Sequence, residues 1–562
     1  MKLSNNLSPE QLLQQSQSLQ QAGQFEEAAI GFEKLRKLYP TYPPILNSLG
    51  IVYLQLGKFK DGCKLLEKSL QLDPKQAMVF YNLGRAYQNQ GQFNDAIAAY
   101  KRALKIDPHF KEGYESLGIL LHNQGIFDEA AKCFDNMIVA YPNHAGAYNG
   151  RGISLYALGL YEEALISLKA AVTINAQAPE VHNNLGLTFH KLNRIDQAIH
   201  HYNLALQVNP NYADAYSNRG LSFQALKKTA EASNDFNHCL DILPNHADAN
   251  WNKALIKLSL GDYEEGWRLY EWRWKSFSKK WARHYKQPVW LGEEPIEGKS
   301  ILIYPEQGYG DFIQFYRYIP KLQALGAKVI LETPGPLINL ISGSSTEIKL
   351  IEAGQTSPQF DVQCPIMSLP LAFKTNLGNI PNTFPYLSTS DEKNTQWENL
   401  LGARTRKRIG IAWSGSREHK NDHNRSIALT ELSPLFTMSF EFHSLQKEIR
   451  ETDQAFFDNS NIVNHQDNIH DFSDTAALIS HMDLVITVDT AIAHLAGSLN
   501  KKVLILIPSI SDYRWMFDRN DSPWYPTATL FRQKELGHWK ETIFDIKNKL
   551  SENVNSIAYT EM

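Results

Sequence analysis

The chain has 562 residues, which is too long for one domain and enough for three or four. Hydrophobic residues make up 43% and charged residues 21%, and the net charge of -4 gives no electrostatic reason to expect binding to nucleic acid or to an anionic membrane. The four cysteines are widely spaced, so neither a zinc site nor a disulfide framework is expected. Because no signal-peptide core and no run of about 18 apolar residues occurs, we expect a cytoplasmic protein without a membrane span.

The first half of the sequence repeats with a period of 34 residues. One set of glycines falls at this spacing, at Gly50, Gly84, Gly118, Gly152, Gly186 and Gly220. Further sets of glycine, alanine and proline keep the same register. The pattern resembles the tetratricopeptide repeat, in which small residues let two antiparallel helices cross closely and proline ends the second helix. We predict an α-solenoid of about eight repeats over residues 1–280.

A solenoid of this kind has a concave groove, and such grooves usually hold extended chains or helices. We therefore expect a protein or peptide partner, with a spacer or an oligomerisation platform as the alternative. Asparagines recur on the first helix of several repeats, at Asn82, Asn149, Asn183, Asn218 and Asn252. Their amides either hold a partner's backbone or form ordinary hydrogen bonds between repeats.

The last repeat differs from the others because it is rich in tryptophan. Trp251, Trp267, Trp272 and Trp274 lie in it, and Trp281 and Trp290 follow in the segment 281–298. A terminal repeat is expected to be atypical. We predict that this one packs against the next domain and that 281–298 is an interdomain junction.

The second half alternates short apolar runs with helical patterns, which is typical of doubly wound parallel sheets. The strands that we predict are Ser300–Tyr304, Val329–Glu332, Ile348–Ile351, Arg408–Trp413, Phe440–Leu445, Ile462–Asn464, Leu484–Val488 and Val503–Ile507. They divide into two Rossmann-like units, at 299–387 and 388–562, with a cleft implied between them. Ligands bind outside the carboxyl ends of such strands.

Two turns that follow predicted strands contain glycine. In the first, Gly308 and Gly310 precede Asp311, which we expect to open an amphipathic helix; an N-cap role is the alternative for this aspartate. In the second, Ser414 and Gly415 follow a buried strand. The basic residues after it, Lys420 and Arg425, either neutralise a diphosphate or form a solvated loop.

The third turn carries the sharpest pattern. Leu484–Val488 runs into Asp489-Thr490, and a helix begins at Ala491, so a hydroxyl and free N–H groups meet at a helix N-terminus. That is an anion site, although a plain Thr490 cap would look the same. His494, one turn on, either orients this turn or is a buried structural histidine. A fourth stretch, 512–526, either shapes a sugar or acceptor pocket or packs its aromatic residues between domains.

Together these turns resemble the glycosyltransferase family that includes the bacterial heptosyltransferases, of the GT-B fold, over roughly residues 298–550. The resemblance rests on Gly310-Asp311 and on the D-T-x-x-x-H-L-A pattern of residues 489–496. It implies that Asp311 is the base for the acceptor hydroxyl. It also implies that Asp489, Thr490 and Ala491 hold the donor diphosphate, aided by Lys420 or Arg425. Heptosyltransferases usually have glycine where Ala491 stands, and they lack the repeats.

The whole layout resembles bacterial proteins that fuse such repeats to this type of transferase, some of which glycosylate flagellin. It implies inverting, metal-independent transfer from a nucleotide-sugar to Ser or Thr of a protein held by the repeats, with no cofactor. One alternative is a repeat scaffold with a degenerate transferase domain. Others are a transferase acting on lipopolysaccharide or polysaccharide, and another GT-B enzyme such as a nucleotide-sugar epimerase.

Overall fold

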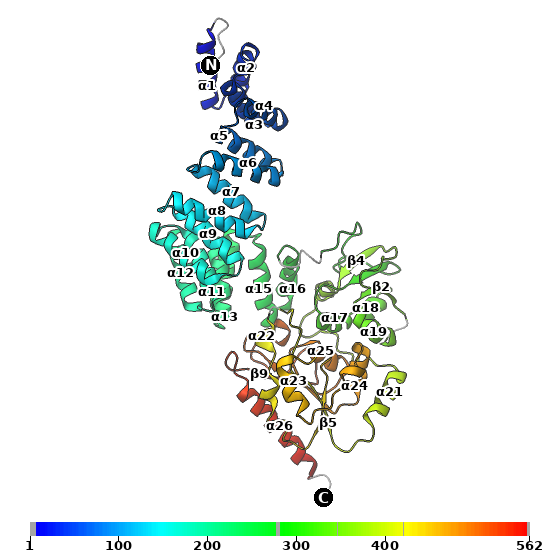
Figure 1. Cartoon of the computed structure of the whole chain (residues 1–562). Helices are drawn as coiled ribbons and strands as arrows, with labels where there is room; N and C mark the ends of the chain where they lie inside the picture. Colours follow the sequence, from blue (N-terminus) through cyan, green and yellow to red (C-terminus); the bar gives the residue numbers. More distant parts are fainter. Residues whose placement is uncertain (1–6, 277–281, 345–346, 420, 559–562) are drawn as a thin grey trace. The chain divides into compact units, whose positions relative to one another are not determined.

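The structure is a computed structural model that describes residues 7–276, 282–344, 347–419 and 421–558. The chain divides into two compact units, Met1–Leu226 and Lys227–Met562 (Figure 1). The first unit contains repeat helices only. The second contains the last repeat helices and two parallel sheets. Among the described helices, none has the length and apolar character needed to cross a membrane.

Consecutive helices in the N-terminal half confirm the predicted α-solenoid. The first unit contains α1 (Pro9–Gln21), α2 (Phe25–Leu38), α3 (Pro43–Gln55), α4 (Phe59–Leu72), α5 (Ala77–Asn89), α6 (Phe93–Ile106), α7 (Lys111–Asn123), α8 (Phe127–Ala140), α9 (Ala145–Ala157), α10 (Tyr161–Ile174), α11 (Pro179–Lys191), α12 (Ile195–Val208) and α13 (Ala213–Ala225). The second unit begins with α14 (Thr229–Ile242), α15 (Ala247–Ser259), α16 (Tyr263–Tyr270) and the short helix η1 (Glu271–Trp274).

The glycines of the 34-residue register lie where the two helices of a repeat cross. A β-carbon on Gly118 would stand 2.5 Å from the Phe134 ring, and one on Gly84 would stand 2.7 Å from the Tyr100 ring. Both aromatic side chains are buried. The prediction that small residues allow close crossing and that aromatics fill the space is therefore confirmed.

The turn between the two helices of a repeat uses a left-handed residue, as at Gly159 with φ of 80°. Two repeats lack this glycine, and Asn193 and Lys227 stand in its place with φ of 56° and 59°. The turn geometry is thus kept where the glycine pattern is broken, because the adjoining helices fix the chain on either side.

The asparagines of the first helices bond from one repeat to the next. Asn218 donates to Asn183 at 2.9 Å, and Asn184 donates to Asn149 at 2.9 Å. Asn183 is buried. These contacts match the alternative of hydrogen bonding between repeats, and they leave the carbonyl oxygens of Asn149 and Asn183 already paired.

Two parallel sheets confirm the predicted α/β units of the C-terminal half. The first has the strand order β3-β2-β1-β4 and the second has the order β6-β5-β7-β8-β9. The strands are β1 (Ser300–Tyr304), β2 (Lys328–Thr333), β3 (Lys349–Glu352), β4 (Val362–Pro365), β5 (Arg408–Ala412), β6 (Glu441–Ser444), β7 (Leu484–Val488), β8 (Val503–Ile507) and β9 (Ala528–Arg532). All the pairings between named strands are parallel.

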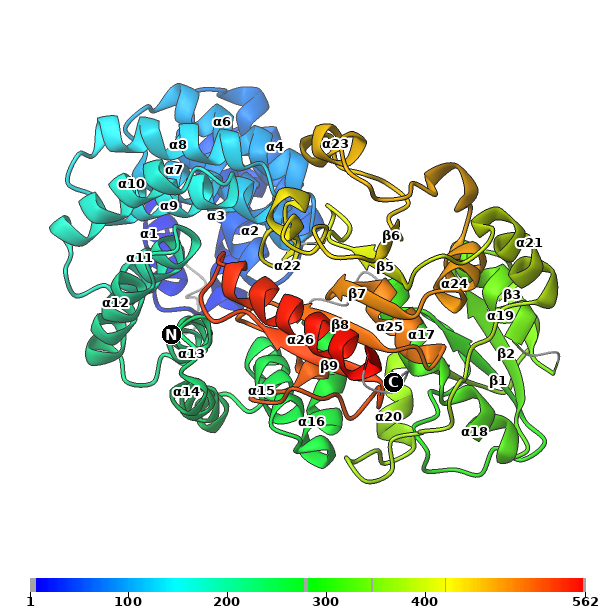
Figure 2. The ribbon, with the colours of Figure 1, turned by 90° about the horizontal axis from the view of Figure 1, so that it is seen from below.

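Helices connect most of these strands. They are α17 (Tyr309–Tyr316), α18 (Ile319–Ala324), α19 (Ile338–Ser344), α20 (Leu369–Ala372), α21 (Asp391–Leu401), α22 (Asp422–Arg425), α23 (Glu451–Asp458), α24 (Phe472–Ser480), α25 (Ala491–Ser498) and α26 (Lys540–Ala558). Helix α26 lies along β9 (Figure 2). The sequence did not predict β4 or β9. The predicted strand Ile462–Asn464 was wrong, because this segment forms only a single bridge, between Val463 and His443.

The last repeat shares one hydrophobic core with both sheets. Trp267 is 2% exposed, and its ring makes edge contacts with Phe315 of α17 and with Tyr513 and Trp524 of the second sheet's loops. The prediction that this repeat packs against the following domain is therefore confirmed. Trp290 of the junction is also buried, against Phe373, while Trp281 lies outside the described residues.

A buried ion pair joins the end of this repeat to the first sheet. Arg273 of η1 forms two hydrogen bonds with the Glu306 carboxylate, at 2.7 and 2.9 Å, and both side chains are fully buried. Arg273 also donates to Glu271 and to Ser368. Glu306 follows β1 and precedes the Gly308–Asp311 turn, so the repeat helix braces the segment that presents Asp311.

Candidate functional site

The predicted turns lie where the strand order of each sheet reverses. In the second sheet β5 and β7 are neighbours. From β5 the chain moves outward to β6 on one side, and from β7 it moves outward through β8 to β9 on the other side. Ser414-Gly415 follows β5 and Asp489-Thr490 follows β7. In the first sheet the reversal lies at β1, which leads into Gly308–Asp311. Such switch points open a crevice at the carboxyl ends of the strands, where ligands of doubly wound folds bind.

The two helices that start at these turns pack against each other. Figures 1 and 2 both show α17 of the first α/β unit beside α25 of the second. A β-carbon on Gly310 would stand 2.7 Å from His494 Cδ2 and 3.5 Å from Ala491 Cα. Only glycine allows this approach, so the Gly310-Asp311 turn and the Asp489-Thr490 turn form one site.

Asp311 is the third residue of α17 and not its first, since the helix begins at Tyr309 with Gly308 as its N-cap. The Gly308 N–H donates to Asp311 Oδ2 at 2.9 Å, so one oxygen has a capping role. The other oxygen, Oδ1, accepts from the Arg514 guanidinium. Burial raises the pKa of Asp311, and Arg514 opposes that shift.

Thr490 caps α25, and its hydroxyl accepts from the Ile492 N–H at 3.3 Å. The expectation of a Thr cap is therefore confirmed, and Ala491 is the first residue of the helix. Asp489, just before the cap, is half-buried. Burial and the nearby Asp512 carboxylate raise the pKa of Asp489 to about 6. The turn thus carries a carboxyl group that titrates close to neutral pH beside a helix N-terminus.

Arg425 lies beside this turn. Its Nη1 donates to the Asp489 carbonyl oxygen at 2.9 Å. The guanidinium also passes over Gly415, where a β-carbon would stand 2.6 Å from Nη2. Its Nε is buried and makes no hydrogen bond to any described residue. A cation therefore lies beside the carboxyl ends of β5 and β7, whereas Lys420 lies outside the described residues.

The loop after β5 is held by polar contacts from β6 and beyond. The Ser414 hydroxyl accepts from Gln446 at 2.9 Å, and the Ser414 N–H donates to the same side chain at 3.3 Å. Arg450 donates to the Gly415 carbonyl oxygen at 3.0 Å and pairs with Asp422 at 2.6 Å. Ser414 is thus oriented by a neighbour, and Gly415 is placed so that Arg425 can lie across it.

His494 is held by aromatic residues of the stretch 512–526. Its Nδ1 is 2.9 Å from the Tyr525 hydroxyl, and its ring stacks on Trp515. Burial, together with the charges of nearby arginines, lowers the pKa of His494 well below its usual value. The imidazole is therefore neutral at pH 7, and its position favours the structural role over orientation of the turn.

Sequence reasoning missed Arg514 and Asp512 as members of the site. Both lie in the stretch 512–526, whose aromatics and charges were noted together without any single residue being assigned to the site. Trp515, Trp524 and Tyr525 are indeed fully buried, as the packing alternative required. Arg514, just before Trp515, instead bonds to Asp311 and to Asp512, and only the Asp-x-Arg spacing hinted at this.

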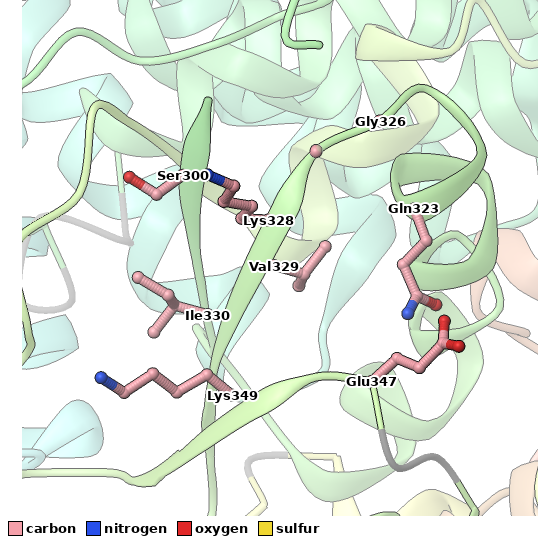
Figure 3. A pocket seen from close by; sticks show the side chains of 9 residues that line it. Ser300, Gln323, Gly326, Lys328, Val329, Ile330, Glu347 and Lys349 are labelled. Carbon is pink, nitrogen blue, oxygen red and sulfur yellow. The ribbon is translucent and has the colours of Figure 1, made fainter. Parts of the chain in front are cut away.

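A surface pocket of the first sheet lies away from this site. Figure 3 shows its lining, which includes Ser300, Lys328 and Lys349, the first residues of β1, β2 and β3. It therefore opens at the amino ends of the strands. The Gly308–Asp311 turn lies at their carboxyl ends, where doubly wound folds bind ligands.

Comparison with known families matches the N-terminal and C-terminal halves of the chain to different families. Tetratricopeptide repeat models match residues 12–42, 43–76, 77–110, 152–193, 179–212 and 213–246. The model of glycosyltransferase family 9 (heptosyltransferase) matches residues 470–543. This chain joins tetratricopeptide repeats to a glycosyltransferase family 9 domain. The transferase match contains Asp489, Thr490, His494 and Arg514, whereas Asp311 lies outside it.

Individual relatives match parts of the chain. Protein FlbA of Caulobacter vibrioides is 24% identical over 317 residues, which cover 52% of this chain and 53% of FlbA. The chain thus spans about half the length of this curated relative. YrrB, described as a TPR protein with an unusual peptide-binding site, is 22% identical over 34% of this chain and all of its own, with a TM-score of 0.29. A TPR repeat-containing protein from Cytophaga hutchinsonii is 18% identical over 42% of this chain and 97% of its own, with a TM-score of 0.37.

Proposed function

We propose that this protein transfers a sugar from a nucleotide-sugar to a hydroxyl group of a protein bound by its repeats. The observation that carries the proposal is the contact of Gly310 with Ala491 and His494. It brings a carboxylate at the end of one parallel sheet to a helix N-terminus at the end of the other. One side of the site then has a proton acceptor, and the other has an anion-binding end. Two facing Rossmann-like units of this kind support the GT-B class.

The proposed reaction is inverting and metal-independent. The acceptor hydroxyl attacks the anomeric carbon, a new carbon–oxygen bond forms, and the bond to the donor phosphate breaks. Asp311 receives the hydroxyl proton, and the leaving nucleoside diphosphate takes the bonding electrons. Thr490, the N–H groups of α25 and Arg425 stabilise the charge that develops on the diphosphate.

A protein acceptor is supported by the length and register of the repeats, whose grooves typically hold peptides. The hydroxyl would come from Ser or Thr, with flagellin or another surface protein as the first acceptor to test. The transferase should be tested without its acceptor module by using residues 227–562, not a fragment that starts after the junction. Trp267 and Arg273 belong to the core of the second compact unit, and a shorter fragment would lose them.

The test has two parts. Release of nucleoside diphosphate is measured from a panel of UDP-, GDP-, ADP- and dTDP-sugars with the wild type, Asp311→Asn and Asp489→Ala. Proteins that co-purify with the chain are then searched by mass spectrometry for a glycan mass. We expect Asp311→Asn to lose about 10²–10⁴-fold in rate while still binding the nucleotide, and Asp489→Ala to weaken nucleotide binding.

The competing function is a repeat scaffold with an inactive transferase domain. It predicts no release from any nucleotide-sugar and no stabilisation of the wild type by any nucleoside diphosphate. Equal rates for the wild type and Asp311→Asn would remove Asp311 as the base. A glycan mass on lipid or polysaccharide, and none on protein, would redirect the proposal to those acceptors.

A further inference from the structure

Asp311 and Arg514 come from different α/β units, yet each carboxylate oxygen of Asp311 has its own donor. Arg514 lies in the short helix η7 (Tyr513–Trp515), after β8 of the second sheet. Its Nη2 meets Oδ1, while the Gly308 N–H holds Oδ2 at 2.9 Å. Two donors on two oxygens fix both the position and the plane of a carboxylate, which a single hydrogen bond does not.

Arg514 is itself held rigidly. Its Nη1 donates to Asp512 Oδ1 and its Nε donates to Gln314 Oε1, both at 2.8 Å. The guanidinium also lies 4.3 Å from the centre of the Tyr513 ring, and the side chain is only 8% exposed. Gln314 follows Asp311 by three residues on α17, so one arginine grips both side chains of the same helix face.

The hydrogen bonds of the Arg514 guanidinium separate its role from that of Arg425. A cation that binds the donor phosphates needs free N–H groups. Every nitrogen of Arg514 is already held by Asp311, Asp512 or Gln314, which fixes its guanidinium in place, whereas Arg425 keeps an Nε without a hydrogen bond to the described residues.

We propose that Arg514 is a positioning residue for the transfer reaction. It holds the Asp311 carboxylate in the orientation that receives the proton of the acceptor hydroxyl, and it does so from the unit that binds the donor. This inference rests on the proposed function, because it takes Asp311 as the base. The base is then in place only when the loop after β8 is seated against α17.

The charged groups that face Asp311 set its pKa, so the proposal predicts how the pH dependence of the rate changes when they are removed. They are Arg514, Asp512 and His419, which lie in two loops of the second α/β unit. Arg514 lowers the pKa of Asp311 and Asp512 raises it. Removing the arginine therefore shifts the pH at which Asp311 ionises upward, and removing the neighbouring carboxylate shifts it downward. A purely structural defect would not give opposite shifts. Because Asp512 and Arg514 act on the pKa of Asp489 in the same directions, the shifts are assigned to Asp311 only if they persist in an Asp489→Asn background.

The first experiment uses the full chain and the nucleotide-sugar that the wild type hydrolyses. Nucleotide release is followed from pH 5 to 9 for Arg514→Gln, Asp512→Asn and Arg519→Gln. Arg519 is the matched control, because it pairs with Asp521 in the same loop and is only partly buried. We expect Arg514→Gln to lose about 10²-fold in rate, as a misplaced catalytic group does, with its acidic limb moved to higher pH. Asp512→Asn should move the limb to lower pH, and Arg519→Gln should not move it.

The second experiment does not depend on turnover. Thermal unfolding at pH 7.5 is measured for Arg514→Gln, Asp311→Asn and the double variant. If Arg514 holds Asp311, the fall in Tm of the double variant is smaller than the sum of the two single falls, because Asp311→Asn removes the charge that Arg514→Gln leaves unpaired.

The outcomes separate this inference from the proposed function. Additive falls in Tm, or an acidic limb that Arg514→Gln leaves in place, would overturn the positioning role. If no nucleotide-sugar is hydrolysed, the proposed function fails, and the unfolding measurements alone decide whether Arg514 holds Asp311. Full turnover by Asp311→Asn would remove the base and this inference with it.

Discussion

The close approach of Gly310 to α25 can be tested by adding one methyl group. In Gly310→Ala the new β-carbon would stand 2.7 Å from His494 Cδ2, whereas carbon atoms normally approach to about 3.5 Å or more. His494 has little room to move, because Tyr525 bonds its Nδ1 and Trp515 stacks on its ring. We therefore expect α17 and α25 to separate by about 0.8 Å.

The cost of such overpacking is about 1–3 kcal/mol. For a unit as large as Lys227–Met562, with about 2.1 cal/mol/K of unfolding entropy per residue, this lowers Tm by roughly 1–4 °C. The assay is thermal unfolding of the second unit in the full chain. Because the two turns would also be misplaced, nucleotide release should fall by up to about 10²-fold.

Gly308→Ala is the matched control for stability. Its β-carbon would lie 3.5 Å from Asp311 Oδ2, an ordinary contact, and the backbone at Gly308 has φ of -78°. We expect its Tm to stay within about 1 °C of the wild type. The reasoning is refuted if Gly310→Ala is as stable as Gly308→Ala, or if the Gly310→Ala cost is unchanged when His494 is replaced by alanine.

Two further predictions concern buried charges and histidines. Glu306→Gln leaves Arg273 without the full charge of its partner, so we expect the free energy of unfolding, measured with urea, to fall by about 3–5 kcal/mol. A variant with methionine at both positions should recover much of this loss, and a loss below about 1 kcal/mol for Glu306→Gln would contradict the account. Burial lowers the pKa of His443 and His465 to about 4. Below pH 6.5 the unfolded chain therefore binds more protons than the folded chain, and the free energy of unfolding falls by up to about 3 kcal/mol per histidine as the pH drops to 4. His465→Gln should flatten that dependence between pH 6.5 and 4, and an unchanged slope would exclude these histidines as its source.

The repeats could be predicted in detail because their signal is local. Each residue of the 34-residue register packs against a partner sixteen positions later, as Gly118 does against Phe134, so spacing alone identifies the contact. The pattern could not show that Lys227 would adopt the left-handed turn, since lysine rarely does so without fixed helices on both sides, whereas asparagine, as at Asn193, is a common substitute for glycine there.

The sheets and the site were predicted in part. The strands β4 and β9 were missed; each is the last named strand of its sheet, and only an isolated bridge forms on its outer side. The turns at Asp311 and Asp489 were found because a strand followed by a helix start is visible in sequence. Arg514 was not, because it lies 203 residues from Asp311 and only the packing of two units brings them together. Contacts of that range leave no periodic trace in one sequence.

The most direct measurement is a crystal structure of Asp311→Asn with an intact nucleotide-sugar, which that variant should not consume. The account predicts the diphosphate at the N-terminus of α25, within hydrogen-bond reach of Thr490 and Arg425, and the anomeric carbon facing residue 311. A nucleotide bound elsewhere, such as in the pocket by Ser300 and Lys328 at the amino ends of the strands (Figure 3), would contradict it.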